Sequence, residues 1–355
     1  MATTAPPQLP AAFDRYRAEI EAGLRHALDN RPSPLYDMLR YHLGWQGRAG
    51  GPGPGPSGKG LRPTVCLVVS DAVAGAHRRA LPAAAAVELV HNFSLVHDDI
   101  QDGDAERHHR PTVWRVFGTA QAINAGTAMY ALAGLALGRL DEEGVPPRRQ
   151  LTALRLIHAS CLRLLEGQYA DLDFENRSDV TVDDYLSMIR GKTGALLGCS
   201  AALGALLGRS PPDADGTGED DVVRAFLELG EGLGMAFQIR DDMLGIWGDP
   251  RRTGKPVGAD IAARKKSFPV VDALERASEA ARRELLELYR APEIDAAGRA
   301  RVLDILTDVG SQARAGVLAA EYRGRALAAV AELDLDRAAL ADLEAIATFL
   351  TERDH

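Results

Sequence analysis

Aromatic residues are scarce in this chain of 355 residues, where phenylalanine, tryptophan and tyrosine together make up 5%. Long runs of β-branched residues are also missing, so an extensive β-sheet is not favoured. Within a hydrophobic share of 46%, alanine and leucine dominate, and both residues favour helix. We therefore expect an all-α fold.

Positive charge is in deficit, because 41 lysines and arginines face 50 aspartates and glutamates, for a net charge of −9. Proteins that bind nucleic acid without further specialisation carry a basic face, and this balance argues against that class. An anionic small molecule would need a local pocket of cations. We therefore expect no nucleic-acid partner.

Cysteines and long apolar runs are also few. Cys66, Cys161 and Cys199 are widely spaced and form no metal-binding pair, so they are expected to be buried thiols in a reducing compartment. The chain has no run of about 18 apolar residues and no signal-peptide pattern at its start. These absences predict a soluble cytoplasmic protein without stable membrane insertion.

Glycine and proline divide the chain into helical segments. The stretch 47–60, GRAGGPGPGPSGKG, is expected to be too flexible for regular structure. We expect one domain of about a dozen helices, in which residues 1–57 form N-terminal helices and a flexible linker and residues 58–355 form the main helical domain. Apolar periodicity predicts helices over 11–30, 34–45, 61–77, 81–102, 111–139, 148–172, 182–208, 221–247, 267–290, 297–331 and 336–352.

An unusual concentration of acid follows one apolar helix, in the stretch LVHDDIQDGD at 95–104. Asp98 and Asp102 are four residues apart, so on a helix their carboxylates share a face, with Asp99 one step round. Like charges at this spacing repel unless a cation lies between them. Mg²⁺ takes oxygen ligands and commonly binds one or two carboxylates together with substrate phosphates.

A second acidic pair, Asp241 and Asp242, ends another apolar helix in the stretch FQIRDDMLGIWGDP. Acidic residues at a helix C-terminus oppose the helix dipole, which costs a few tenths of a kcal/mol or more unless a cation compensates. Carboxylates on two facing helices can hold several metal ions in the core of a bundle. The two acidic stretches together predict a shared metal site.

Lysine is rare in comparison with arginine. Of 41 basic residues only five are lysines, and four of these lie beside turn signals. Lysine is a compact charge that suits phosphate oxygens. With the two acidic pairs, these positions favour a site for metal and diphosphate. The lysines are Lys59, Lys192, Lys255, Lys265 and Lys266.

Six segments in a fixed order resemble the trans-isoprenyl diphosphate synthase family, most closely its geranylgeranyl diphosphate synthases. The resemblance covers residues 58 to 269 and implies a helical bundle around a central cavity. Its motifs are GKGLRP (58–63), ELVHNFSLVHDDIQD (88–102), RHHRPTVW (107–114), EGQYADL (166–172), GKTGALL (191–197) and the stretch 237–269 that begins FQIRDD.

The resemblance implies a role for each acidic residue. Asp98, Asp102 and Asp241 would ligate Mg²⁺, about three ions in all, and Mn²⁺ would substitute. Asp99 and Asp242 would lie beside these ligands. Together with Lys192, the residues Asp98, Asp99, Asp102 and Asp241 form the implied catalytic set.

The resemblance also implies two diphosphate subsites. Cations and polar groups from several motifs would bind the allylic diphosphate, and a separate set would bind isopentenyl diphosphate. The first set is Arg107, Lys192, Thr193, Gln238, Lys255 and Lys265; the second is Lys59, Arg62, His91 and His108.

The implied reaction is a condensation of isopentenyl diphosphate with an allylic diphosphate. Metal ions and cations favour departure of diphosphate because negative charge develops on it as the allylic C–O bond breaks. The double bond of isopentenyl diphosphate attacks the allylic cation, and a proton is then lost. Apolar walls keep water from the cation.

Two positions depart from the family pattern. His108 stands where a second arginine is common, which puts one contact to isopentenyl diphosphate in question and leaves Arg110 as a candidate replacement. Gly245 stands where the second acidic motif usually ends in aspartate. Because the ligand position corresponds to Asp241, we expect metal binding to survive.

Product length is expected to depend on the residues that precede the first acidic motif. Phe93 lies five residues before Asp98, about 7.5 Å along a helix, and the small Ser94 lies four before it. One aromatic at the fifth position and none at the fourth resembles enzymes that make the C20 product, geranylgeranyl diphosphate. On an ideal helix Phe93 lies about 140° round from Asp98, so its position in the tunnel rests on the resemblance.

Several alternatives stay open. Farnesyl (C15) diphosphate is the next product length. A terpene cyclase on the same scaffold would use no isopentenyl diphosphate, and His108 and Gly245 keep that hypothesis open. A non-catalytic regulatory subunit ranks lowest, because it predicts lost ligands or lysines. The resemblance also implies a homodimer, for which the uncharged faces of 111–139 are candidates.

Overall fold

The computed structural model describes residues 9–48, 50–55, 58–209, 219–253 and 256–352. Within these ranges the chain is almost entirely helical, so the predicted all-α class is confirmed. The first half contains α1 (Ala11–Leu28), α2 (Pro34–His42), α3 (Leu61–Ala74), η1 (His77–Ala80), α4 (Leu81–Gln101), β1 (Glu106–Arg107), β2 (Arg110–Pro111), α5 (Val113–Phe117), α6 (Thr119–Gly138), η2 (Arg139–Asp141) and α7 (Pro147–Phe174).

The second half continues the same pattern of long helices joined by short breaks. It contains α8 (Val182–Ile189), the π-helical turn η3 (Arg190–Gly194), α9 (Ala195–Gly208), α10 (Glu219–Trp247), α11 (Pro250–Thr253), α12 (Ala259–Ala262), α13 (Phe268–Arg276), α14 (Glu279–Arg290), α15 (Ala296–Val309), α16 (Ser311–Ala328) and α17 (Arg337–Glu352).

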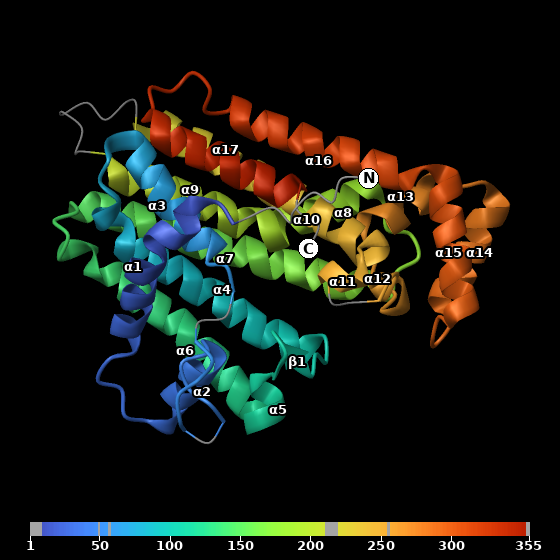
Figure 1. The fold of residues 1–355 in the computed structure, drawn as a ribbon, viewed down its shortest axis with the longest axis horizontal. Coiled ribbons are helices and arrows are strands. Elements are labelled where there is room, and N and C mark those ends of the chain that lie inside the picture. Colours follow the sequence, from blue (N-terminus) through green and yellow to red (C-terminus); the bar gives the residue numbers. More distant parts are fainter. Residues whose placement is uncertain (1–8, 49, 56–57, 210–218, 254–255, 353–355) are drawn as a thin grey trace.

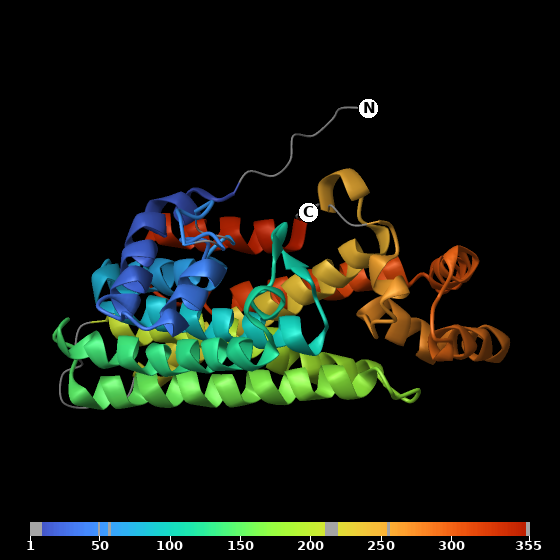
Figure 2. The same ribbon diagram turned by 90° about the horizontal axis from the view of Figure 1, so that it is seen from below.

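The long helices lie side by side as a bundle (Figure 1). Seen from below, α6 and α7 form one side of the molecule, and α1 and α17 lie toward the opposite side (Figure 2). In both views α14 and α15 project at one end. The helices α3, α4, α9 and α10 fill the space between these layers.

The centre of the bundle contains α9, which is apolar on every face, and the largely buried α3. All residues of α9 are buried, and α3 is buried over nine of its positions. A helix with no polar face has to be surrounded by other helices, which places α9 between α3, α7 and α10. Helices α1, α2 and α17 contribute to the same hydrophobic core.

Breaks divide three of the predicted helices, 111–139, 267–290 and 297–331. Gly118, with φ of 85°, separates α5 from α6 within 111–139, and Gly310, with φ of 75°, separates α15 from α16 within 297–331. Both residues adopt left-handed backbone that glycine reaches without steric cost. Ser278 caps the new start of α14 by accepting a hydrogen bond from the Ala281 amide. The predicted helix 182–208 is helical throughout, and the π-helical turn η3 joins α8 to α9 within it.

A small hairpin, β1–β2, was not expected from the alternation of residues. Glu106 pairs with Pro111 and Arg107 with Arg110 in antiparallel register. The pattern was too short to detect, because each strand contains two residues.

The segment rich in glycine and proline forms turns over its described residues. Gln46 bridges Pro52, the Gly53 amide donates to the Trp45 carbonyl at 3.0 Å, and the Gly55 amide donates to the Gly44 carbonyl at 3.0 Å. The predicted boundary between 57 and 58 falls beside residues 56–57, which lie outside the described residues, and the division into two segments stays a prediction.

Two further expectations concern thiols and membranes. All three cysteines are free and buried, as predicted. Over the part of the chain that the structure describes, no helix combines the length and apolarity that a membrane crossing requires.

Gly204 tests how closely α9 packs on α3. A Cβ at this position would lie 2.3 Å from the Cys66 carbonyl oxygen and 2.9 Å from Val69 Cβ. We expect Gly204→Ala to lower the free energy of unfolding by about 1–3 kcal/mol, because overpacking displaces the backbone. The midpoint of urea unfolding measures the change.

Gly324 provides the matched control for this experiment. It lies exposed within α16, and a Cβ there would meet nothing within 4 Å. Gly324→Ala should raise stability by about 0.4–1 kcal/mol through the unfolded chain. Equal effects of the two substitutions would contradict the packing described for α9.

Candidate active site

A cavity of about 510 Å³ opens among α3, α4, α7, α10 and α17. Its lining combines apolar residues such as Leu95, Leu164 and Phe237 with many charged groups. Most residues predicted from the sequence meet here, although they come from five separate stretches of chain. They are Lys59, Arg62, His91, Ser94, Asp98, Asp99, Arg107, His108, Lys192, Thr193, Gln238 and Asp241.

A second, smaller cavity of about 200 Å³ adjoins the first, since Lys192, Gln238 and Asp241 line both. Lys265 and Asp260 belong to its lining. Burial acts to lower the pKa of Lys265, but nearby carboxylates, Asp260 foremost, raise it on balance. Lys265 thus lies beside the proposed diphosphate site as a charged group, whereas Lys255 lies outside the described residues.

The aspartates of the first acidic stretch, at the end of α4, lie in different environments. Asp98 lines the main cavity, and burial raises its pKa to about 6 although Lys192 opposes the shift. Asp102 is the C-terminal cap of α4, exposed, and it lines neither cavity. Of the two carboxylates predicted to share a face, Asp98 therefore belongs to the cavity lining and Asp102 does not.

Asp99 forms an ion pair with Arg107. Its Oδ1 atom lies 2.8 Å from both Nε and Nη2 of that arginine. Only 1% of Asp99 is exposed, and its Oδ2 atom has no hydrogen-bond partner among the described residues. Asp99 thus positions a predicted diphosphate ligand, and it leaves one buried oxygen available to water or a cation.

The turn of the β1–β2 hairpin carries His108 to the cavity. His108 and His109 have φ of 50° and 59°, the left-handed conformations that a two-residue hairpin turn requires. Residues other than glycine adopt this region at a cost, so the hairpin holds His108 in a strained conformation. The burial of its ring lowers the pKa of His108.

Arg110 has partners of its own. Its guanidinium donates to the carbonyls of Tyr41 and Gln46 at 3.1 and 3.2 Å, and it stacks 4.4 Å from the centre of the Tyr41 ring. These contacts fasten the hairpin to the end of α2. Although Arg110 lines the cavity, its hydrogen bonds already serve the fold.

Arg62 and His91 both line the main cavity and contact each other. Arg62 Nη1 donates to His91 Nε2 at 3.1 Å. Burial holds the pKa of His91 well below its ordinary value, so the ring stays neutral and can accept. Arg62 Nε is buried without a hydrogen-bond partner among the described residues.

His42, Asn92 and Glu88 extend this polar region and were not predicted. Asn92 donates to the carbonyl and carboxylate of Glu88 at 2.8 and 3.1 Å and accepts from His42 Nε2 at 3.0 Å. Burial lowers the pKa of His42 to about 3, which keeps it neutral. In the sequence, only the spacing of four residues between Glu88 and Asn92 indicated that these two side chains would be neighbours on a helix.

Lys192 and Thr193 reach the site on the π-helical turn η3. Lys192 forms an ion pair with Asp171 of α7, and Thr193 Oγ1 donates to Gln238 Oε1 at 2.8 Å. A Cβ on Gly167 would lie 2.2 Å from the Lys192 amide nitrogen. The bare backbone of Gly167 therefore allows the turn to approach α7 closely.

The second acidic pair has two different environments. Asp241 is exposed and lines both cavities, whereas Asp242 is buried. Asp242 accepts from the Tyr185 hydroxyl at 2.6 Å, the Phe268 amide at 2.8 Å and Gln238 Nε2 at 3.0 Å. Burial raises its pKa to about 7 against these hydrogen bonds. No sequence pattern indicated Tyr185.

Gly245 leaves room for a carboxylate from another helix. A Cβ built on it would lie 2.0 Å from Asp260 Oδ2. The space next to Gly245 is therefore filled by Asp260, which lines the smaller cavity with it.

Phe93 and Ser94 point in different directions. Ser94 lines the main cavity, but Phe93 does not belong to its lining. Phe93 packs against His97 and Tyr130 of α6, with ring centres 5.0 and 5.4 Å apart, and is 6% exposed. The predicted role of Phe93 in product length stays a prediction.

The donor set fits divalent ions bound jointly with diphosphate. Within the described ranges no three His, Cys, Asp or Glu side chains converge enough to hold an ion by themselves. Asp98 and Asp241 instead line one cavity from α4 and α10. One or two carboxylates completed by phosphate oxygens is the usual arrangement for Mg²⁺.

Comparison with known proteins places the chain in a family. The model of the polyprenyl synthetase family matches residues 54–306, more than half of the chain. Geranylgeranyl diphosphate synthase of Mycobacterium tuberculosis is 46% identical over 282 residues, or 79% of this chain and 77% of that protein. A (2E,6E)-farnesyl diphosphate synthase of Mycobacterium bovis is 42% identical over 264 residues, or 74% of this chain and 70% of that protein.

The fold gives the same result as the sequence. The solved geranylgeranyl pyrophosphate synthetase of Pyrococcus horikoshii has a TM-score of 0.84 and 34% identity, covering 96% of this chain and 98% of that one. The resemblance seen in the motifs is therefore confirmed. The chain belongs to the polyprenyl synthetase family and is a prenyltransferase.

Proposed function

We propose that this prenyltransferase condenses isopentenyl diphosphate with allylic diphosphates and that its main product is the C20 compound geranylgeranyl diphosphate. The observation that carries the proposal is one cavity whose lining contains both the carboxylate of Asp98 with Lys192 and the contacting pair Arg62 and His91. Apolar side chains, among them Leu95, Leu164 and Phe237, line the same cavity. Such a cavity suits two diphosphate substrates joined through their hydrocarbon parts.

One set of residues in the cavities would bind the allylic diphosphate. Lys192 is a compact cation for phosphate oxygens, and Thr193 and Gln238 offer polar groups that already contact each other. Arg107, aligned by Asp99, adds a forked donor. Lys265, in the lining of the smaller cavity, would add charge at the mouth of the site. Lys255, which lies outside the described residues, stays part of the predicted allylic diphosphate set.

A second set of cavity residues would bind isopentenyl diphosphate. Lys59 and Arg62 would hold its diphosphate, and His91 would keep the Arg62 guanidinium aligned through its neutral ring. His108 completes this set at the hairpin turn. These residues favour a condensing enzyme over a cyclase, which needs no second diphosphate subsite.

Prenyl synthases of this family use a divalent metal. We assign Mg²⁺, about three ions with Mn²⁺ as a substitute, and name Asp98, Asp102 and Asp241 as the protein ligands. When bound, the metal would neutralise negative charge that develops on the departing diphosphate.

The chain's own residues account for the rest of the reaction. Lys192 and Arg107 stabilise the leaving diphosphate as the allylic C–O bond breaks. The double bond of isopentenyl diphosphate attacks the allylic cation and forms the new C–C bond. A proton then leaves the adjacent carbon for the released diphosphate, and the apolar wall excludes water from the cation.

The test is incubation of the purified protein with Mg²⁺, labelled isopentenyl diphosphate and dimethylallyl, geranyl or farnesyl diphosphate. A labelled C20 alcohol that is extractable only after phosphatase treatment is expected, and a C15 alcohol would identify a farnesyl diphosphate synthase. Hydrocarbon released from an allylic diphosphate alone would identify a cyclase and overturn the proposal.

Asp98→Asn tests the metal assignment in the same assay. It keeps the shape of the side chain but removes its charge, so turnover should fall by about 10²-fold or more. Circular dichroism should show an unchanged helical fold. An Asp98→Asn enzyme with the activity of the wild type would contradict the assignment.

Phe93→Ala tests the control of product length. We expect products longer than C20, because removal of the ring opens space between α4 and α6 at the expected depth of the growing chain. Chromatography of the dephosphorylated products measures their length. An unchanged product profile would show that Phe93 does not limit elongation.

A homodimer is also proposed, through the outer faces of α6 and α7. Large apolar side chains are exposed there at helical spacing, among them Leu135 (59%), Leu162 (62%) and Tyr169 (73%). Leu162→Arg should shift the protein from dimer to monomer in sedimentation velocity. Val317→Arg, at an exposed position of α16, should leave the mass unchanged; a monomeric wild type would refute the dimer.

A further inference from the structure

Phe349 of α17 lies against a residue that the proposed function uses. Its ring centre is 4.9 Å from the Lys59 ammonium, and both residues line the main cavity. Phe349 is 6% exposed, whereas Lys59 is exposed. A lysine in a turn rich in glycine thus faces an aromatic ring that is fixed by the core.

The ring is held in place by the neighbouring helix α1. Phe13 packs against it with ring centres 5.9 Å apart and an interplanar angle of 60°. Two turns before Phe349 on α17, Asp342 forms an ion pair with Arg15 of α1. The Phe13–Phe349 and Arg15–Asp342 contacts therefore fasten α17 to α1 and hold the Phe349 ring in place beside the cavity.

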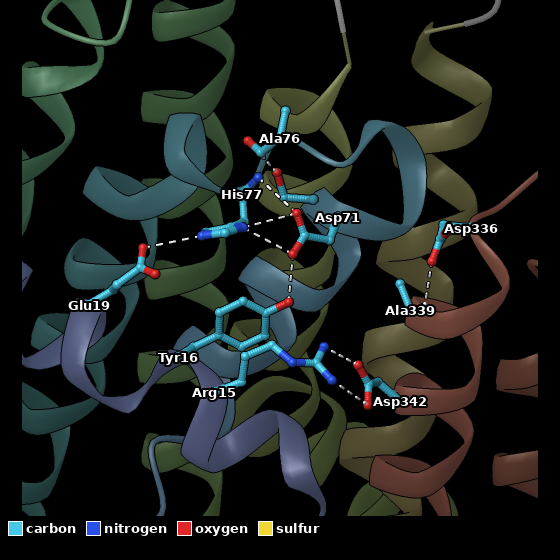
Figure 3. A network of polar contacts seen from close by, with 10 residues as sticks. Arg15, Tyr16, Glu19, Asp71, Ala76, His77, Asp336, Ala339 and Asp342 are labelled. Carbon is cyan, nitrogen blue, oxygen red and sulfur yellow. Dashed lines mark hydrogen bonds and ion pairs between the residues drawn. The ribbon is translucent and has the colours of Figure 1, made fainter.

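Figure 3 shows the outer part of this attachment. Beside the Arg15–Asp342 pair, the Tyr16 hydroxyl donates to Asp71 of α3 at 2.6 Å. His77 lies between Asp71 and Glu19, with contacts of 3.0 and 3.2 Å. Helix α1 is thereby joined to both α3 and α17, and Lys59 lies just before α3.

The physical consequence concerns the freedom of a long side chain. A lysine has four rotatable bonds, and binding a diphosphate requires that it give up most of its rotamers. The negative face of an aromatic ring attracts the ammonium and reduces the rotamers that it samples beforehand. The ring does not fully desolvate the ammonium, so the charge stays accessible to an anion.

We propose that Phe349 is a positioning residue for isopentenyl diphosphate, acting by holding the Lys59 ammonium at the wall of the cavity. This inference rests on the proposed function, because it takes Lys59 as a ligand of that substrate. The sequence offered no indication of it, since Phe349 lies in the last predicted helix, far from every motif.

The test compares Phe349→Leu with Phe349→Tyr in steady-state kinetics. Leucine keeps an apolar side chain but has no ring face, so the KM for isopentenyl diphosphate should rise about two- to fivefold. The KM for the allylic diphosphate and kcat should change by less than about twofold. Tyrosine keeps the ring and should restore the KM of the wild type.

Phe226→Leu provides the matched control. Phe226 is fully buried in the same hydrophobic core but does not line the cavity. The Phe226→Leu variant should be less stable than the wild type but should have the same KM for isopentenyl diphosphate. An equal rise in this KM for Phe226→Leu would show a general packing effect and overturn the inference.

A double-mutant cycle with Lys59→Met identifies the path of the effect. If Phe349 acts through Lys59, Phe349→Leu should have no further effect in the Lys59→Met background. Full additivity, or a lower KM for isopentenyl diphosphate in Phe349→Leu, would overturn the inference.

The wild type separates this inference from the proposed function. A wild type that incorporates no isopentenyl diphosphate would refute both. A wild type that incorporates it, with a raised KM in Lys59→Met and an unchanged KM in Phe349→Leu, would leave the function standing and refute the role of Phe349.

Discussion

Close backbone packing between α7, the π-helical turn and α10 is the constraint on which the site depends. Cβ atoms on Gly167 and Gly234 would lie 2.2 Å from the Lys192 amide nitrogen and 2.7 Å from Gly194 Cα. Only glycine permits helices to approach so closely. The turn consequently lies between the two helices, where Lys192 contacts Asp171 of α7 and Thr193 contacts Gln238 of α10.

Two of the cations that line the cavity are held in ion pairs, because an unpaired buried charge is costly. Arg107 is paired with Asp99, and Lys192 with Asp171. Each pair keeps a cation in place at the cavity wall. A bound diphosphate can therefore meet donors that are already oriented, and less free energy is lost in ordering side chains.

Much of the site was predictable because its residues cluster in short motifs. Asp98 and Asp241 stand out as acidic residues after apolar helices, and Lys192 stands out in a chain with five lysines. Tyr185 and His42 were not predictable, since each acts through a partner distant in sequence, Asp242 and Asn92. Their roles depend on which helices become neighbours.

The amino-acid sequence by itself determined the helical class, the family motifs and the buried position of α9, whose residues are apolar on every face. These properties follow from local periodicity and composition, which can be read without knowing which helices pack together. The tertiary structure alone decided that Ser94 faces the cavity while Phe93 packs against Tyr130, and that Asp260 fills the space beside Gly245. Such choices depend on helix rotation and close packing between distant segments, which are set by the whole core rather than by any one stretch of chain.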